Sequence, residues 1–134
     1  MYQCKHFIIQ ELVPPHIYHK RGDKAWELLD AKALRMLDAV RERFGVTTVN
    51  NWHLGRDREW SGLRTADSPY FSATSQHTFG RAFDCIFNGV SAEDARRYIL
   101  AHSDEFPFIT SMELGTSWLH FDVRNCDAVK TFYP

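Results

Sequence analysis

Cysteine is scarce in this sequence, and none of it sits in a pairing motif. Cys4, Cys85 and Cys126 make an odd count without any C-x-x-C spacing. This argues against a disulfide framework and against a cage of thiolate ligands around zinc. We expect three small thiols, buried or half-buried, in a reducing compartment.

Long hydrophobic runs are also missing. The N-terminal stretch "MYQCKHFIIQEL" holds an apolar run of only three residues. Such a run is too short for the core of a signal peptide or for a membrane span, so we expect no membrane insertion. The protein should be made and kept in a cytosol unless another protein exports or releases it.

An excess of charge of one sign is absent as well. The sequence carries 16 Lys and Arg against 17 Asp and Glu, a formal net charge of −1. Nothing in this balance points to nucleic acid or to an anionic membrane surface. The chain also lacks internal repeats, low-complexity tracts and long linkers.

What is present suits one soluble globular domain. The 134 residues are 44 % apolar and 25 % charged, and a chain of this length can bury a core without disulfides. We expect a single domain over residues 1–134 and a monomer.

Apolar spacing predicts the secondary structure. Residues 23–44 show an apolar face at helical spacing, with Asp23 as the expected N-cap and Gly45 as the expected end. "SAEDARRYILAH" carries a serine followed three positions later by an acid, which predicts a second capped helix. "VTTVN", "RAFDCIFN", "FPFITSMEL" and "WLHFDV" read as strands. The expected fold is α+β, with a small, mostly antiparallel sheet and helices on one side.

Residues 51–80 form a long irregular stretch rich in Asn, Gly, Ser, Asp, Thr and Pro. Irregular segments of this length are uncommon in compact domains and are often functional. His77 ends this stretch, and Asp84 lies in the strand that follows. Gly80, between them, tolerates a positive φ and lets the backbone turn sharply.

Strand alternation suggests how a third residue joins them. In "WLHFDV", Trp118, His120 and Asp122 point to one face, and the apolar residues point to the other. His120 is either an ordinary polar residue or a ligand held on a rigid strand. Two histidines and one carboxylate make a three-ligand zinc site whose fourth position stays open for water. Zinc there lowers the pKa of that water towards about 7 and polarises a carbonyl.

The motifs also resemble a known family. "SGLRTADSPYFSATSQHTFGRAFD", followed by "ELGTSWLHFDV", is similar to the zinc D-alanyl-D-alanine carboxypeptidases. That family includes phage endolysin L-alanyl-D-glutamate peptidases and is structurally related to hedgehog signalling domains. The matching positions, within residues 60–123, are Ser61, Gly62, Arg64, Ser75, His77, Gly80, Ala82, Asp84, Glu113, Trp118 and His120.

The resemblance assigns roles to five residues. It implies that His77, Asp84 and His120 bind Zn²⁺, and that Glu113 is the general base. It implies that Arg64 stabilises the oxyanion or holds a carboxylate of the substrate.

Two of these roles have alternatives. Many family members carry their acid three residues before the last histidine, where this chain has Ser117. Glu113 is then either the base, brought back by a turn through "LGTS", or a plain surface acid. Arg64 can equally form a surface salt bridge.

For three other residues the sequence leaves two alternative roles open. Trp52 and Trp60 either line a groove for sugar or peptide or pack the irregular stretch down. Asp122 either orients a ligand through a hydrogen bond or is a solvated edge residue. The remaining histidines show no ligand pattern and are expected to be surface or structural: His6, His16, His19, His53 and His102.

The expected function is a zinc-dependent peptidase that hydrolyses stem peptides of bacterial peptidoglycan, encoded by a phage or prophage. D-Ala-D-Ala, L-Ala-D-Glu and cross-bridge bonds all suit such a site. Its expected place is the cytoplasm of the producing bacterium, with action on the wall after release. The alternatives are a non-catalytic zinc domain, a virion or tail-associated module that acts on the wall, and an α+β domain without metal.

Overall fold

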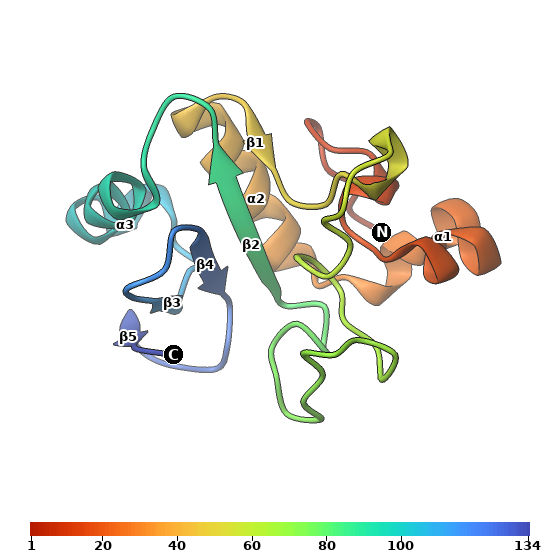
Figure 1. Ribbon diagram of the computed structural model, residues 1–134. Helices are drawn as coiled ribbons and strands as arrows, with labels where there is room; N and C mark the ends of the chain where they lie inside the picture. Colours follow the sequence, from red (N-terminus) through yellow and green to blue (C-terminus); the bar gives the residue numbers. More distant parts are fainter.

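The computed structural model describes all 134 residues, which form an α+β domain (Figure 1). The α-helices are α1 (Pro15–Arg21), α2 (Ala31–Phe44) and α3 (Ala92–Ala101). The strands are β1 (Thr47–Thr48), β2 (Ala82–Phe87), β3 (Ser111–Glu113), β4 (Leu119–Asp122) and β5 (Lys130–Phe132). Short 3-10 segments are η1 (Ile9–Glu11), η2 (Gly22–Leu28), η3 (Trp52–Leu54) and η4 (Ser103–Glu105).

The five strands make one mixed sheet in the order β1-β2-β4-β3-β5. The pairs β1–β2, β2–β4 and β3–β4 are antiparallel, whereas β3–β5 is parallel. The α+β class and the small sheet are confirmed, but the sheet is not wholly antiparallel. After β4 the chain crosses over β3 to the far edge of the sheet. There β5 runs in the same direction as β3.

The first long helix is shorter than its apolar pattern indicates. Residues Gly22–Leu28 form a 3-10 segment, and α2 begins only at Ala31. Asp30 is the N-cap, because its side chain accepts hydrogen bonds from the backbone N–H groups of Lys32 and Ala33. The expected cap at Asp23 was therefore wrong, whereas Gly45 does follow the helix with a φ of 84°.

The second predicted helix is confirmed with its cap. Ser91 precedes α3, and its side chain accepts a hydrogen bond from the backbone N–H of Asp94. Ala95 and Ile99 on one face of α3 are buried in the core. This helix therefore begins where the serine and the acid three positions later predict.

Alternation along the strands separates the core from the polar face. Phe83 and Cys85 of β2, with Leu119 and Phe121 of β4, are fully buried in one hydrophobic cluster. Both α2, through Leu34, Leu37 and Val40, and α3 contribute to this same cluster, and α2 lies behind β2 in Figure 1. The residues between these apolar positions point to the opposite face of the sheet.

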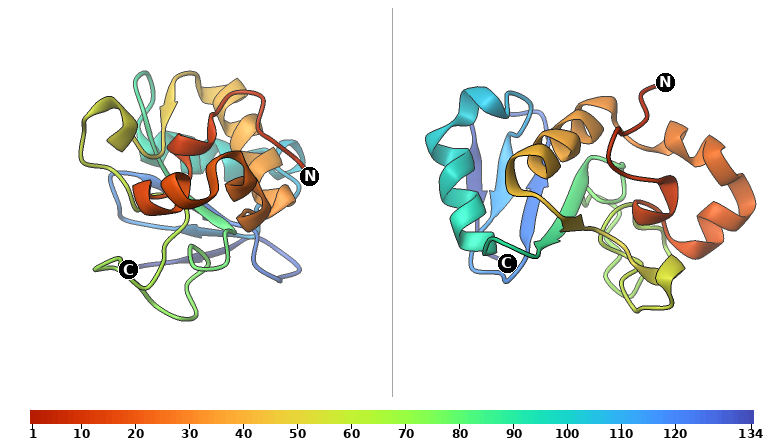
Figure 2. Two further views of the ribbon diagram at one scale, coloured as in Figure 1. Left: turned by 90° about the vertical axis from the view of Figure 1, so that its right-hand side faces the viewer. Right: turned by 90° about the horizontal axis from the view of Figure 1, so that it is seen from above.

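The irregular stretch before β2 contains η3 as its only regular element. It projects from the side of the molecule away from α3 (Figure 2). All three cysteines are free thiols, Cys85 buried and Cys4 and Cys126 half-buried. The longest helices fall short of the length and apolarity that crossing a membrane requires.

Candidate metal centre

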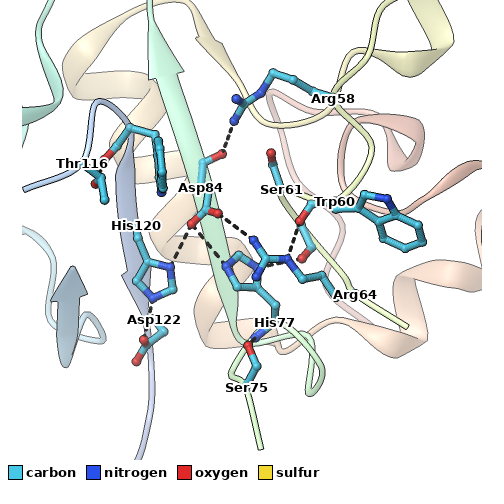
Figure 3. Close-up of polar contacts among 12 residues, drawn as sticks. Arg58, Trp60, Ser61, Arg64, Ser75, His77, Asp84, Thr116, His120 and Asp122 are labelled. Atoms are coloured by element: carbon cyan, nitrogen blue, oxygen red, sulfur yellow. Dashed lines mark hydrogen bonds and ion pairs between the residues drawn. The ribbon is translucent and has the colours of Figure 1, made fainter. Parts of the chain in front are cut away.

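Asp84 and His120 are brought together by the pairing of β2 with β4. They are direct cross-strand partners, and their side chains lie on the polar face of the sheet. His120 Nδ1 lies 2.9 Å from Asp84 Oδ1 (Figure 3). Both residues are buried, Asp84 at 7 % exposure and His120 at 5 %. Antiparallel register thus turns 36 residues of sequence separation into one side-chain contact.

His77 reaches the same carboxylate from the irregular stretch. Its Nε2 lies 3.2 Å from Asp84 Oδ1, and its Nδ1 donates a hydrogen bond to the Gly62 carbonyl at 2.8 Å. Because a carbonyl can only accept, this bond places the proton on Nδ1 and leaves Nε2 to face Asp84. The backbone N–H of His77 also donates to Ser75 Oγ, which fixes the turn before it.

These three residues can hold a metal ion. One ligand atom from each of His77, Asp84 and His120 lies within 4.8 Å of the other two. Tetrahedral zinc with bonds of about 2.0–2.2 Å places its ligand atoms about 3.3 Å apart. The separations of 2.9 and 3.2 Å from Asp84 Oδ1 are close to that value. The donor set, two imidazoles and a carboxylate, fits zinc and other borderline divalent ions.

At two glycines of the motifs, Gly62 and Gly80, the structure leaves no room for a side chain. Gly80 has a φ of 69°, and a Cβ there would lie 2.1 Å from the carbonyl oxygen of Leu28. A Cβ at Gly62 would lie 2.2 Å from the carbonyl oxygen of Leu12. Close backbone packing at these two points holds the strand-flanking loops where His77 can reach Asp84.

Arg64 contacts the site through its guanidinium. Its NH2 group donates to Asp84 Oδ2 at 3.0 Å, and its Nε donates to the Trp60 carbonyl at 2.8 Å. The side chain is 18 % exposed and lines the cleft described below. Its partner is therefore a buried metal-ligand candidate, which differs from the surface salt bridge considered as the alternative.

Glu113 lies on the same face of the sheet as the ligands. In the β3–β4 register, Ser111 pairs with Asp122 and Met112 with Phe121, and Glu113 follows Met112 at the end of β3. Because strand residues alternate, Glu113 points away from the core that Met112 enters. Glu113 is half-buried and lines the cleft. Ser117 is exposed and lines a different hollow, next to Thr116.

Asp122 is a buried partner of His120 and no solvated edge residue. It is 0 % exposed, and its Oδ2 lies 2.9 Å from His120 Nε2. Arg124 donates to both oxygens of the same carboxylate, from Nε to Oδ1 and from NH2 to Oδ2, each at 2.7 Å. Both edges of the His120 ring are thus held, one by each carboxylate.

Charge is balanced tightly within this cluster. Burial opposes the charged form of Asp84, but the imidazoles of His77 and His120 outweigh it and hold the pKa of Asp84 well below its usual range. Burial also disfavours the imidazolium of His120, yet hydrogen bonds to Asp122 and Asp84 raise its pKa to about 9. Burial works against charged Asp122, while Arg124 and His120 hold its pKa below the ordinary value. Both carboxylates stay anionic, as ligation of a cation and its support require.

A cleft of about 900 Å³ opens over these residues. Most of its lining residues come from the irregular stretch, and His77, Asp84, Glu113 and His120 also line it. Trp60 lines the cleft, as one interpretation of the two tryptophans expected. Trp52 instead donates its indole N–H to the Val13 carbonyl at 2.9 Å and packs the stretch down.

The sequence did not predict several residues that hold the segments around the site. Asn50 is buried and bridges two segments, donating to the Val13 carbonyl and accepting from the backbone N–H of Ser61. Arg58 donates to the carbonyl of Val49 and, at 3.4 Å, to the backbone carbonyl of Asp84. These side chains hold loops through backbone atoms, and such pairings leave no spacing pattern in a sequence. Arg124 could have been predicted, because it follows His120 and Asp122 at the two-residue spacing of one strand face.

No family model, no curated protein and no solved structure matches this chain. The family resemblance accordingly remains an expectation carried by the motif residues. The geometry described above stands independently of it.

Proposed function

We propose that this protein is a zinc-dependent peptidase that hydrolyses stem peptides of bacterial peptidoglycan. One observation carries the proposal: Glu113 lines the same open cleft as His77, Asp84 and His120, on the polar face of the sheet. A metal site with a free carboxylate beside it, open to a cleft, suits hydrolysis better than purely structural metal binding.

Zinc held by His77, Asp84 and His120 would supply a Lewis acid for the scissile carbonyl and would acidify the attacking water. The chain's own residues do the rest. Glu113 accepts the proton of the water and passes it to the leaving amine. The Glu113 side chain is half-buried and lines the cleft, so its carboxylate is open to the water there.

Arg64 stabilises negative charge near the reacting carbonyl. Its guanidinium is fixed by Asp84 and by the Trp60 carbonyl, so its position costs no reorganisation during the reaction. Bidentate capture of a substrate carboxylate is a second use of the same group. The cleft of about 900 Å³ has room for a short peptide, and Trp60 offers an apolar wall.

The biological setting follows from the family resemblance. We propose a phage or prophage origin and a fold of the hedgehog and D-Ala-D-Ala peptidase type. The protein would be made in the bacterial cytoplasm and would reach the wall after release, or would act on it from a virion. Mass spectrometry of purified particles separates these two settings.

The test is hydrolysis of purified sacculi, followed by mass spectrometry of the released peptides. Wild type with zinc should release fragments with new termini, and the cut bond is read from their masses. Glu113→Gln should lose hydrolysis at least a hundredfold while it still binds zinc, because the proton acceptor is gone. Glu42→Gln, far from the cleft on α2, is the matched control and should keep full activity.

A non-catalytic zinc domain remains the competing function, and Ser117 at the usual position of the acid favours it. That function predicts stoichiometric zinc without release of peptides from any sacculus tested. It also predicts that Glu113→Gln leaves every measurable property unchanged. Either result would contradict the peptidase proposal.

A further inference from the structure

Asp122, Arg124 and Phe132 form a layer around the Nε2 side of His120, whose Nδ1 side faces Asp84, and Arg124 and Phe132 also line the cleft. The Asp122 carboxylate accepts two hydrogen bonds of 2.7 Å from the Arg124 guanidinium and lies 2.9 Å from His120 Nε2. The Phe132 ring from β5 lies 5.8 Å from the His120 ring and 5.1 Å from the Arg124 guanidinium, measured between centroids and the guanidinium carbon. The layer therefore combines a charged clamp with an aromatic cover.

We infer that Arg124 and Asp122 are positioning residues that orient His120 for metal binding, an inference that rests on the proposed zinc site. Asp122 accepts the Nε2 proton of His120, which directs the Nδ1 lone pair towards the ion. Arg124 holds the Asp122 carboxylate in the one orientation that does this. Neither residue belongs to the group of three candidate ligands.

The strand geometry explains why this pairing is so rigid. His120, Asp122 and Arg124 alternate along one strand and its extension, so all three project to the same face. Asp122 is 0 % exposed, so bulk water does not compete for the hydrogen bonds of its carboxylate. The arginine fork matches both carboxylate oxygens, which a lysine cannot do.

The cover by Phe132 adds a role for the C-terminal strand. β5 is held beside β3 by parallel pairing, and the Leu114 backbone N–H donates to the Phe132 carbonyl at 2.7 Å. The ring lies against the Arg124 guanidinium and covers part of the Arg124–Asp122 pair, which strengthens its electrostatic interaction. Loss of the ring should loosen the clamp without removing any of its hydrogen-bonding groups.

The experiment measures zinc affinity by competition with a chromophoric chelator, with no substrate present. Asp122→Asn and Arg124→Gln should each weaken zinc binding about ten- to a hundredfold, the usual effect of removing a partner behind a ligating histidine. Arg124→Lys should restore only part of the loss, and Phe132→Leu should cost less than Arg124→Gln. Arg56→Gln, an exposed arginine outside the cleft, is the control and should bind like wild type.

A second measurement reports the orientation directly. In the zinc-loaded protein, nitrogen NMR of the histidine rings should show His120 bound through Nδ1 and protonated at Nε2. In Arg124→Gln the Nε2 proton should exchange faster with water. This readout also covers the case in which Asp122→Asn does not fold, because Arg124 is 27 % exposed and its replacement is tolerated more easily.

The outcomes separate this inference from the function it builds on. If wild type binds zinc, but Asp122→Asn and Arg124→Gln bind it within threefold of wild type, the positioning role is wrong and the peptidase proposal stands. If His120 binds zinc through Nε2, the inference is also wrong. If wild type binds no zinc, the metal site itself is wrong and both proposals are lost.

Discussion

His120 on β4 and Asp84 on β2 are direct cross-strand partners, and His120 Nδ1 lies 2.9 Å from Asp84 Oδ1. The sheet register therefore builds two thirds of the candidate metal site without any help from loops. Only His77 depends on the irregular stretch, and two glycines without room for a side chain hold that stretch in place.

Zinc should stabilise the folded protein through these three ligands. A ligand that binds only the folded state at a hundred times its Kd adds about 2.7 kcal/mol to the free energy of unfolding. For a domain of this size the midpoint of thermal unfolding should rise by about 10 °C. Differential scanning calorimetry with zinc and with a chelator measures the difference. Asp84→Asn should abolish the zinc-dependent part, and an unchanged shift in this variant would contradict the assignment of Asp84.

Gly80→Ala and Gly62→Ala should both destabilise the fold. The new Cβ would lie 2.1 and 2.2 Å from backbone oxygens that cannot move without their segments, and Gly80 also has a positive φ. We expect a loss of about 2 kcal/mol or more in the free energy of unfolding for each. Urea denaturation is the measurement. Gly89→Ala, where a Cβ meets nothing within 4 Å, is the control and should be nearly neutral.

Asp30→Ala should weaken α2, whereas Asp23→Ala should not. The Asp30 side chain accepts hydrogen bonds of 2.8 and 3.1 Å from the first turn of the helix. Its loss should cost about 0.5–2 kcal/mol, the usual range for an N-cap. Asp23 makes no cap, so its replacement should stay within about 0.5 kcal/mol of wild type. Equal costs in urea denaturation would mean that the helix begins earlier than the structure shows.

Arg96→Leu should loosen the turn between Glu113 and His120. Arg96 is 3 % exposed and donates to the carbonyls of Thr116 and Trp118, each at 3.0 Å. The variant leaves these acceptors without their donor, at a cost of about 2 kcal/mol or more. Because the turn joins the two strands of the site, hydrolysis should fall as well. The control is Arg97→Gln, an arginine 75 % exposed on the same helix, which should match wild type in both denaturation and hydrolysis.

Local patterns predicted the parts of the fold that depend on neighbouring residues. The alternation in "WLHFDV" correctly placed His120 and Asp122 on one face and Phe121 in the core. Ser91, with an acid three positions later, correctly predicted the start of α3, where its side chain accepts a hydrogen bond from the Asp94 N–H. Both features depend on side chains that interact within a few residues, so the sequence displays them.

The features that escaped prediction depend on distant partners. The apolar face of residues 23–44 is real, but Asp30 interrupts the helix, since its own N–H donates to the Gly80 carbonyl at 2.9 Å. β5 is only three residues long, too short for a clear sequence pattern, and it pairs with β3. Its Phe132 therefore reached the site without a sequence signal. The place of Glu113 beside the cleft likewise follows from strand pairing, which the sequence does not display.

The most direct test of the central claim is anomalous diffraction at the zinc absorption edge from crystals grown with zinc. We expect one strong peak within about 2.0–2.2 Å of His77 Nε2, an Asp84 carboxylate oxygen and His120 Nδ1, with Glu113 facing its open side. A zinc ion bound elsewhere on the chain, with these three side chains unligated, would contradict the account.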